Sequence, residues 1–153
     1  MSNNNQRKGA LSNSRVGRDF EDAALRYFEK FENFTLERNV KISVGISEPK
    51  KQHAFDLGCS YQKILVECKS HKWTEGNNVP SAKMTVWNEA MYYFLLAPGS
   101  YRKIMFVLKD YSHKKQKTLA RYYIDRYQHL IPNNVEFMEF DESNNSVELL
   151  KRS

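Results

Sequence analysis

Apolar residues recur along this chain at two kinds of interval, which alternate from one segment to the next. Intervals of three and four residues predict amphipathic helices in a segment that begins after Ser14 and in residues 81–96 and 114–130. Short runs rich in β-branched and aromatic residues predict strands at 34–44, 53–59, 64–70, 101–108 and 135–140, with a short edge strand at 147–150. The resulting order αβββαβαβ predicts an α/β fold, with a mixed central sheet flanked by helices.

Three charged residues interrupt the second and third predicted strands. Side chains alternate between the faces of a strand, so Glu67 and Lys69 point the same way and Asp56 faces away from both of its apolar neighbours. Burying a charge costs free energy unless the charge is paired or binds a ligand. A hairpin through residues 60–62 would bring the two carboxylates and the ammonium together at one edge of the sheet. The pattern therefore predicts a divalent-metal site with a lysine beside it.

The spacing Asp-x10-Glu-x-Lys of Asp56, Glu67 and Lys69 resembles the PD-(D/E)xK nuclease superfamily, over residues 17 to about 110. Phe55 stands where the family name has proline. The resemblance implies a restriction-endonuclease-like αβββαβ core and a Mg²⁺-dependent phosphodiesterase, an endonuclease or an exonuclease acting on DNA. It also implies that the acidic pair binds Mg²⁺ or Mn²⁺ and that Lys69 assists hydrolysis.

The same resemblance implies further site residues on the first two helices. A first-helix glutamate adds a metal ligand in many relatives, and Glu21 is the candidate here, although Asp19 and Asp22 compete for the role. Carboxylates near the start of a helix are also favoured by the helix dipole. Polar residues of the second helix, Lys83 and Asn88, could reach the phosphate, but Asn88 could equally be a hydrogen-bonded structural amide.

The loop after the third predicted strand adds two candidates for substrate binding, Lys72 and Trp73, and the adjacent His71 could also contact substrate. Trp73 could stack on a base or pack down as a lid. The four histidines show no spacing typical of a zinc site.

Composition narrows the class of protein. The chain has 153 residues and a formal charge of +6 with a pI near 9.3, which favours a polyanionic partner such as DNA. Residues 1–14 are polar and predict a disordered tail, leaving 15–153 as one domain. No apolar run approaches the roughly eighteen residues of a membrane span, and no signal peptide is visible, so we expect a cytoplasmic protein without a membrane partner. Cys59 and Cys68 are expected to be free thiols in the core.

Alternatives to a DNA nuclease stay open at this point. The same fold could serve as a catalytically weak module that binds nucleic acid, or as a nuclease directed at RNA or at junctions. A third alternative is an interaction subunit that dimerises through the tyrosine-rich third helix. A homodimer would also be needed for one active site per chain to cut both strands of a duplex.

Overall fold

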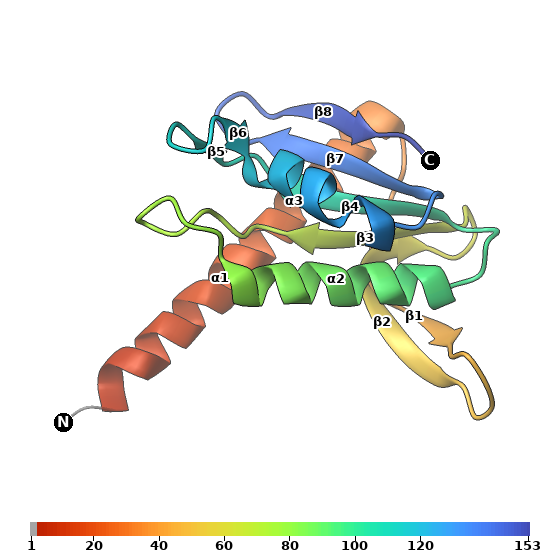
Figure 1. Cartoon of the computed structure of the whole chain (residues 1–153). Helices are drawn as coiled ribbons and strands as arrows, with labels where there is room; N and C mark the ends of the chain where they lie inside the picture. Colours follow the sequence, from red (N-terminus) through yellow and green to blue (C-terminus); the bar gives the residue numbers. More distant parts are fainter. Residues whose placement is uncertain (1–2) are drawn as a thin grey trace.

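A six-stranded mixed sheet forms the centre of this computed structural model, which describes residues 3–153 and the side chains from residue 13 onward (Figure 1). The strand order is β1-β2-β3-β4-β7-β8. Strands β3, β4 and β7 are parallel, and the other neighbours are antiparallel. The strands are β1 Glu37–Val44, β2 Lys51–Cys59, β3 Ile64–Lys69, β4 Arg102–Leu108, β7 Val135–Asp141 and β8 Ser146–Lys151. The predicted α/β class with a mixed sheet is confirmed.

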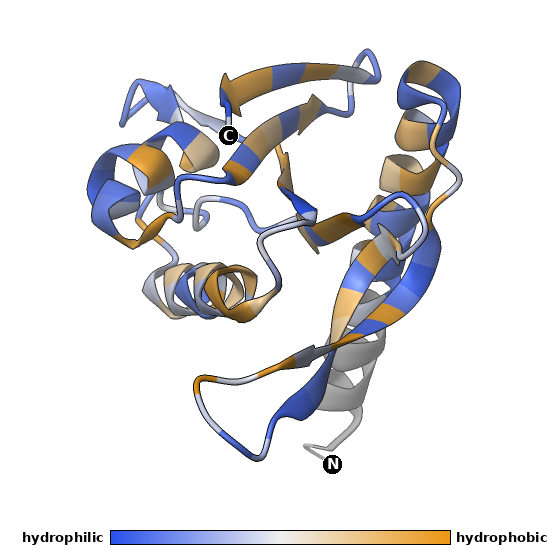
Figure 2. Cartoon of the chain, turned by 90° about the vertical axis from the view of Figure 1, so that its right-hand side faces the viewer, coloured by the Kyte–Doolittle hydropathy of each residue, from blue (hydrophilic) through white to orange (hydrophobic). Residues whose placement is uncertain are grey.

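Helices cover both faces of this sheet, and a separate core lies under each layer. The helix α1 (Asn3–Tyr27) and a π-helical turn η1 (Phe28–Glu32) pack on one face, where Phe20, Ala24 and Phe28 are buried. The helix α2 (Ser81–Leu96), the helix α3 (Leu119–Tyr127) and a 3₁₀ turn η2 (Gln128–Leu130) cover the other face. In Figure 2 the sheet lies between α1 and the other helices. Among the described residues, no helix has the length and apolar content that a membrane crossing requires.

Two helix starts differ from the prediction. The helix α1 begins at Asn3 rather than after Ser14, while the disorder expected for residues 1–14 stays a prediction. The third helix begins at Leu119 rather than at 114, because residues 111–118 form a small hairpin of β5 (Tyr111–Ser112) and β6 (Lys117–Thr118). Thr118 caps the helix by accepting a hydrogen bond from the backbone N–H of Arg121 (3.2 Å).

The pairing of β1 with β2 is interrupted opposite Asp56. The ladder pairs Arg38 with Leu57 and Val40 with Phe55, but it has no pair at the intervening positions Asn39 and Asp56. Asn39 has a left-handed backbone (φ 53°), which turns the strand at this point. As a result Phe55 packs in the core under α2 while Leu57 packs in the core under α1. The prediction that both neighbours of Asp56 share one face was therefore wrong.

Candidate active site

The end of β3 carries the acidic cluster that the sequence predicted. Glu67 is buried, with a side chain only 7% exposed, and its Oε2 lies 3.4 Å from Nζ of Lys69. Its other oxygen, Oε1, lies 3.8 Å from Nε2 of His53 on β2. Both carboxylate oxygens of Glu67 thus face nitrogen atoms inside the fold, where solvent screens the charges little.

Asp56 lies beside Glu67, at the position of β2 where the pairing with β1 is interrupted. Its Oδ2 accepts a hydrogen bond from the backbone N–H of Cys68 (2.8 Å), which ties Asp56 across to β3 beside Glu67. Burial, and then the negative charge of Glu67, raise the pKa of Asp56 to about 7, against the lowering effects of the Cys68 N–H and of Lys69. The raised pKa of Asp56 thus reflects its burial first and the nearby charge of Glu67 second.

Two pockets meet at Asp56 and Lys69. The larger has a volume of about 410 Å³ and lies toward α1, where Glu21, His71 and Lys83 line it. The smaller pocket, of about 170 Å³, lies under α2, and Glu67 lines this pocket but not the larger one. Asp56 and Lys69 therefore connect an open pocket with a narrower one that contains the second carboxylate.

Sequence reasoning missed three residues that line the smaller pocket: His53, Glu89 and Tyr93. The rings of His53 and Tyr93 stack in parallel, with centroids 3.6 Å apart. Glu89 and Tyr93 are one helical turn apart on α2, so their i, i+4 spacing could have marked a polar face directed at the acidic cluster. Glu89 adds a third carboxylate to the pocket that Asp56 and Glu67 line.

His71, which the sequence placed among the loop residues that could contact substrate, lines the larger pocket. The indole N–H of Trp87 donates to Nδ1 of His71 (2.7 Å), so the proton of the neutral ring lies on Nε2. Burial, followed by the charges of Lys83 and Lys69, lowers the pKa of His71 to about 4. His71 is therefore a neutral N–H donor in the larger pocket, suited to an anionic ligand.

Glu21 lines the larger pocket together with Asp56, as a first-helix site residue should. Its carboxylate, however, accepts a hydrogen bond from Arg38 of β1, and the same guanidinium also binds Asp22. Arg38 thus pairs with both of these helix carboxylates, one positive charge between two negative ones. A role for Glu21 as a metal ligand stays a prediction, and such a role would compete with this ion pair.

The four predicted substrate-binding residues lie in different places. Lys83 lines the larger pocket, whereas Lys72 is exposed and lines a neighbouring hollow along α1. Asn88 accepts a hydrogen bond from the hydroxyl of Tyr123 (2.8 Å), so it is the structural amide that the alternative interpretation described.

Trp73 does not offer its ring for stacking on a base. Its side chain is buried, its indole N–H donates to the carbonyl of Asp110 (3.0 Å), and its ring packs edge-on against Tyr122. Trp73 packs down instead, the other interpretation that the sequence left open, because Asp110, just before the β5–β6 hairpin, supplies the hydrogen-bond partner that holds the indole in the core.

The donor atoms of the cluster limit what it can bind. Within residues 3–153, no three His, Cys, Asp or Glu side chains converge closely enough to hold a metal ion as they stand. Magnesium needs only one or two protein carboxylates, because it keeps several of its waters. Comparison of the chain with family models, with curated proteins and with solved structures found no match. The chemistry of the site therefore has to be argued from the geometry itself.

Proposed function

We propose that this protein is a divalent-metal-dependent nuclease that hydrolyses phosphodiester bonds in DNA. The observation that carries the proposal is the convergence of Asp56, Glu67 and Lys69 at two connected pockets. The two carboxylates repel each other, as the raised pKa of Asp56 reflects, and Lys69 alone does not compensate for both. A divalent cation would relieve this repulsion.

The arrangement of the elements supports a restriction-endonuclease-like core. The helix α1, the antiparallel strands β1–β3, the helix α2 and the parallel strand β4 follow one another in the order αβββαβ. The acidic cluster lies where β3 ends between α1 and α2. In open α/β sheets, the carboxyl ends of parallel strands are a common position for ligand sites.

Asp56 and Glu67 are the residues that would hold Mg²⁺ or Mn²⁺, since both are hard oxygen donors and both line the smaller pocket. A bound metal ion of this kind supplies an activated water and neutralises charge on the scissile phosphate. Lys69 lies 3.4 Å from Glu67, where its ammonium can stabilise the negative charge that develops on the phosphate. His71 and Lys83 would bind phosphate oxygens in the larger pocket.

The net charge of +6 supports a polyanionic substrate, since long-range attraction can concentrate DNA at a site that is itself acidic. The alternative of a subunit that dimerises through the tyrosines of α3 has less support. Tyr123 is fully buried and bonded to Asn88, and Tyr122 packs against Trp73. These tyrosines serve the core rather than an interface.

Nicking of supercoiled plasmid tests the proposal directly. We expect wild-type protein to nick the plasmid with Mg²⁺ or Mn²⁺ and to be inactive in a chelator, and we expect Asp56→Ala to be inactive in both. Asp125→Ala is the matched control, because Asp125 is an exposed carboxylate on α3, with a side chain 63% exposed. Metal-dependent nicking that persists in Asp56→Ala would exclude this site as its source.

A further inference from the structure

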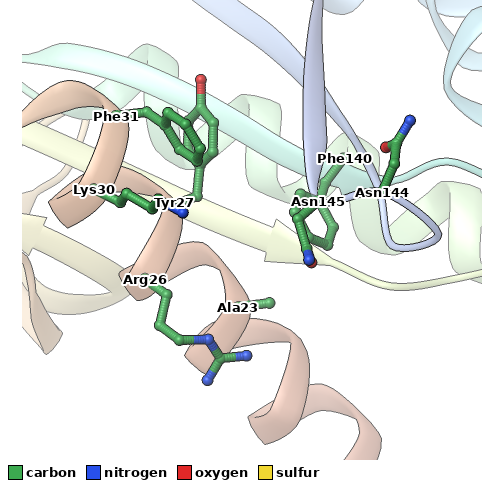
Figure 3. A pocket seen from close by; sticks show the side chains of 8 residues that line it. All are labelled: Ala23, Arg26, Tyr27, Lys30, Phe31, Phe140, Asn144 and Asn145. Carbon is green, nitrogen blue, oxygen red and sulfur yellow. The ribbon is translucent and has the colours of Figure 1, made fainter.

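A further hollow, which we call the aromatic hollow, lies between the end of α1 and the turn that joins β7 to β8. Its volume is about 420 Å³. Figure 3 shows Tyr27 and Phe31 on the helical side and Asn144 and Asn145 across from them. Arg26 and Lys30 complete the lining, so flat aromatic rings, cations and amides occur together.

The aromatic side of this hollow faces solvent. Phe31 is 57% exposed, an unusual position for a large apolar side chain, although its neighbour Phe28 is fully buried. The ring of Phe31 lies 5.3 Å from that of Tyr27, and Nζ of Lys30 lies 5.2 Å from the centre of the Phe31 ring. An exposed ring with an ammonium over it can stack on a nucleobase while the cation binds the adjoining phosphate.

The positive charges of this hollow are not neutralised within the described part of the chain. Arg38, Arg102 and Arg121 each form a salt bridge with a carboxylate. Arg26 and Lys30 form none among residues 13–153. Their charge remains available to an anionic ligand.

The hollow that Lys72 lines, of about 350 Å³, connects the aromatic hollow with the acidic cluster. It shares Val16 and Ser70 with the larger pocket of the cluster, and it shares Arg26 and Asn145 with the aromatic hollow. The aromatic hollow, the hollow at Lys72 and the larger pocket of the cluster thus form one row along α1. From Val16 to Phe31 the row spans about 20 Å at the rise of a helix, the length of about six stacked nucleotides at about 3.4 Å each.

We propose that this row is a binding track for single-stranded nucleic acid, with an unpaired base stacked on Phe31 and phosphates on Arg26, Lys30 and Lys72. The inference rests on the proposed nuclease function and extends it to the substrate class, because stacking on Phe31 requires a base whose face is exposed. Bases within a duplex have both faces covered by their neighbours. A single-stranded end or extension is therefore the expected ligand.

Two carboxylates constrain how a strand would lie along this row. Asp19 and Glu142 line the middle hollow together with Lys72. Carboxylates repel phosphates but accept hydrogen bonds from N–H groups on the edges of bases, among them exocyclic amino groups and the imide N–H of thymine. The strand should therefore turn its base edges toward Asp19 and Glu142 and its backbone toward Lys72.

Binding of fluorescently labelled oligothymidylate, measured by anisotropy in a chelator, tests the track without cleavage. We expect Phe31→Ala and Lys30→Ala each to weaken binding of an oligomer of about twelve nucleotides roughly tenfold. An oligomer of about three nucleotides is too short to span the row, so we expect it to bind the wild type and every variant much more weakly than the long oligomer does. Tyr61→Ala is the matched control, because Tyr61 is a 95% exposed aromatic in the β2–β3 turn. We expect it to bind both oligomers as the wild type does.

The outcomes separate this inference from the proposed function. The proposed track is refuted if Phe31→Ala and Lys30→Ala bind the long oligomer like the wild type, or if Tyr61→Ala loses as much affinity as they do. Either result leaves the proposal of cleavage at Asp56 unaffected. If the track variants lose affinity but plasmid nicking does not depend on Asp56, the catalytic assignment fails and the track stands. Failure of the wild type to bind any oligomer in the chelator overturns the track, and the metal-dependent nicking assay then decides the proposed function on its own.

Discussion

Two clusters of charge lie at opposite ends of the parallel strands, and they are built in opposite ways. At the start of β4, Arg102 binds Glu136 of β7 through two hydrogen bonds of 2.7 and 3.1 Å, and it lies 3.7 Å from Glu32. At the end of β3, Asp56 and Glu67 share the single ammonium of Lys69. The β3–β4 register places Ile64 beside Arg102 and Lys69 beside Val107, so the clusters are one strand length apart.

Their electrostatics differ accordingly. The hydrogen bond to Glu136 raises the pKa of Arg102, which means that the fold favours its charged form. Burial and the charge of Glu67 instead raise the pKa of Asp56, so the fold opposes its charged form. A bidentate arginine pair is a complete structural unit, whereas a buried carboxylate pair with too little positive charge is suited to receive a cation. Under the proposed function, the contrast assigns cleavage to the end of β3 and stability to the start of β4.

Cleavage should show the largest difference between the clusters. We expect Glu67→Gln and Lys69→Ala to lower the rate of nicking by about two orders of magnitude or more, the scale of losing one preorganised transition-state contact. DNA affinity, measured separately, should change far less, because most of it comes from phosphate contacts elsewhere. Arg102→Ala is the control from the other cluster, and per folded molecule it should cleave at the wild-type rate. Parallel loss of binding and cleavage in the β3 variants would make those residues structural.

The free energy of unfolding, unlike the cleavage rate, should depend on the cluster at the start of β4. Arg102→Ala leaves the carboxylate of Glu136 largely buried without its partner, and we expect a loss of about 2 kcal/mol in the free energy of unfolding. For a chain of this length that corresponds to a decrease in Tm of about 4–8 °C, measurable by calorimetry. Lys109→Ala removes a more exposed pair with Asp141 and should change Tm by about 1 °C or less. Equal effects of the two substitutions would contradict the structural role of Arg102.

Metal ions should stabilise only one cluster. A ligand that binds only the folded state at ten times its Kd adds about 1.4 kcal/mol to the free energy of unfolding. We therefore expect Mn²⁺ or Mg²⁺ to raise the Tm of the wild type and of Arg102→Ala by a few degrees. Asp56→Ala should show no such rise. The same shift in Asp56→Ala would indicate that the metal binds elsewhere.

The pH dependence of stability should be the most specific difference. The folded pKa of Asp56, about 7, lies above the ordinary value of 3.8, so the folded state binds more protons between these values. In a chelator, the contribution of Asp56 to stability is thus full below about pH 4 and is lost as pH rises to about 7. Asp56→Asn removes this loss. We expect the variant to match the wild type in Tm near pH 4 and to exceed it near pH 8.

The buried His71 contributes with the opposite sign, because its folded pKa, about 4, lies below the ordinary 6.5. Its contribution to stability grows as pH rises through that range. It is common to wild type and Asp56→Asn, so it cancels in the difference between their Tm values. A difference that is constant with pH would contradict a raised pKa at Asp56.

The elements with strong local signals were predicted well. The helix at Ser81–Leu96 has the predicted bounds, because Met84, Trp87 and Met91 recur on one face and Pro98 and Gly99 follow its end. The strands that carry the acidic residues were also found, because β-branched and aromatic residues mark buried strands. Local composition was insufficient at residues 111–118, where lysine-rich sequence favoured a helix and the chain forms a hairpin.

The sequence by itself determined which charges lie on buried strands, because apolar residues flank Asp56, Glu67 and Lys69 in both strands. Only the tertiary structure decided what those charges meet. The left-handed turn at Asn39 interrupts β1–β2 opposite Asp56, and α2 then brings Glu89 and Tyr93 into the same pocket. Arg38 pairs with Glu21, and Asp110 holds Trp73 in the core. Each of these contacts joins residues far apart in the chain, and a local pattern of residues carries no information about such distances.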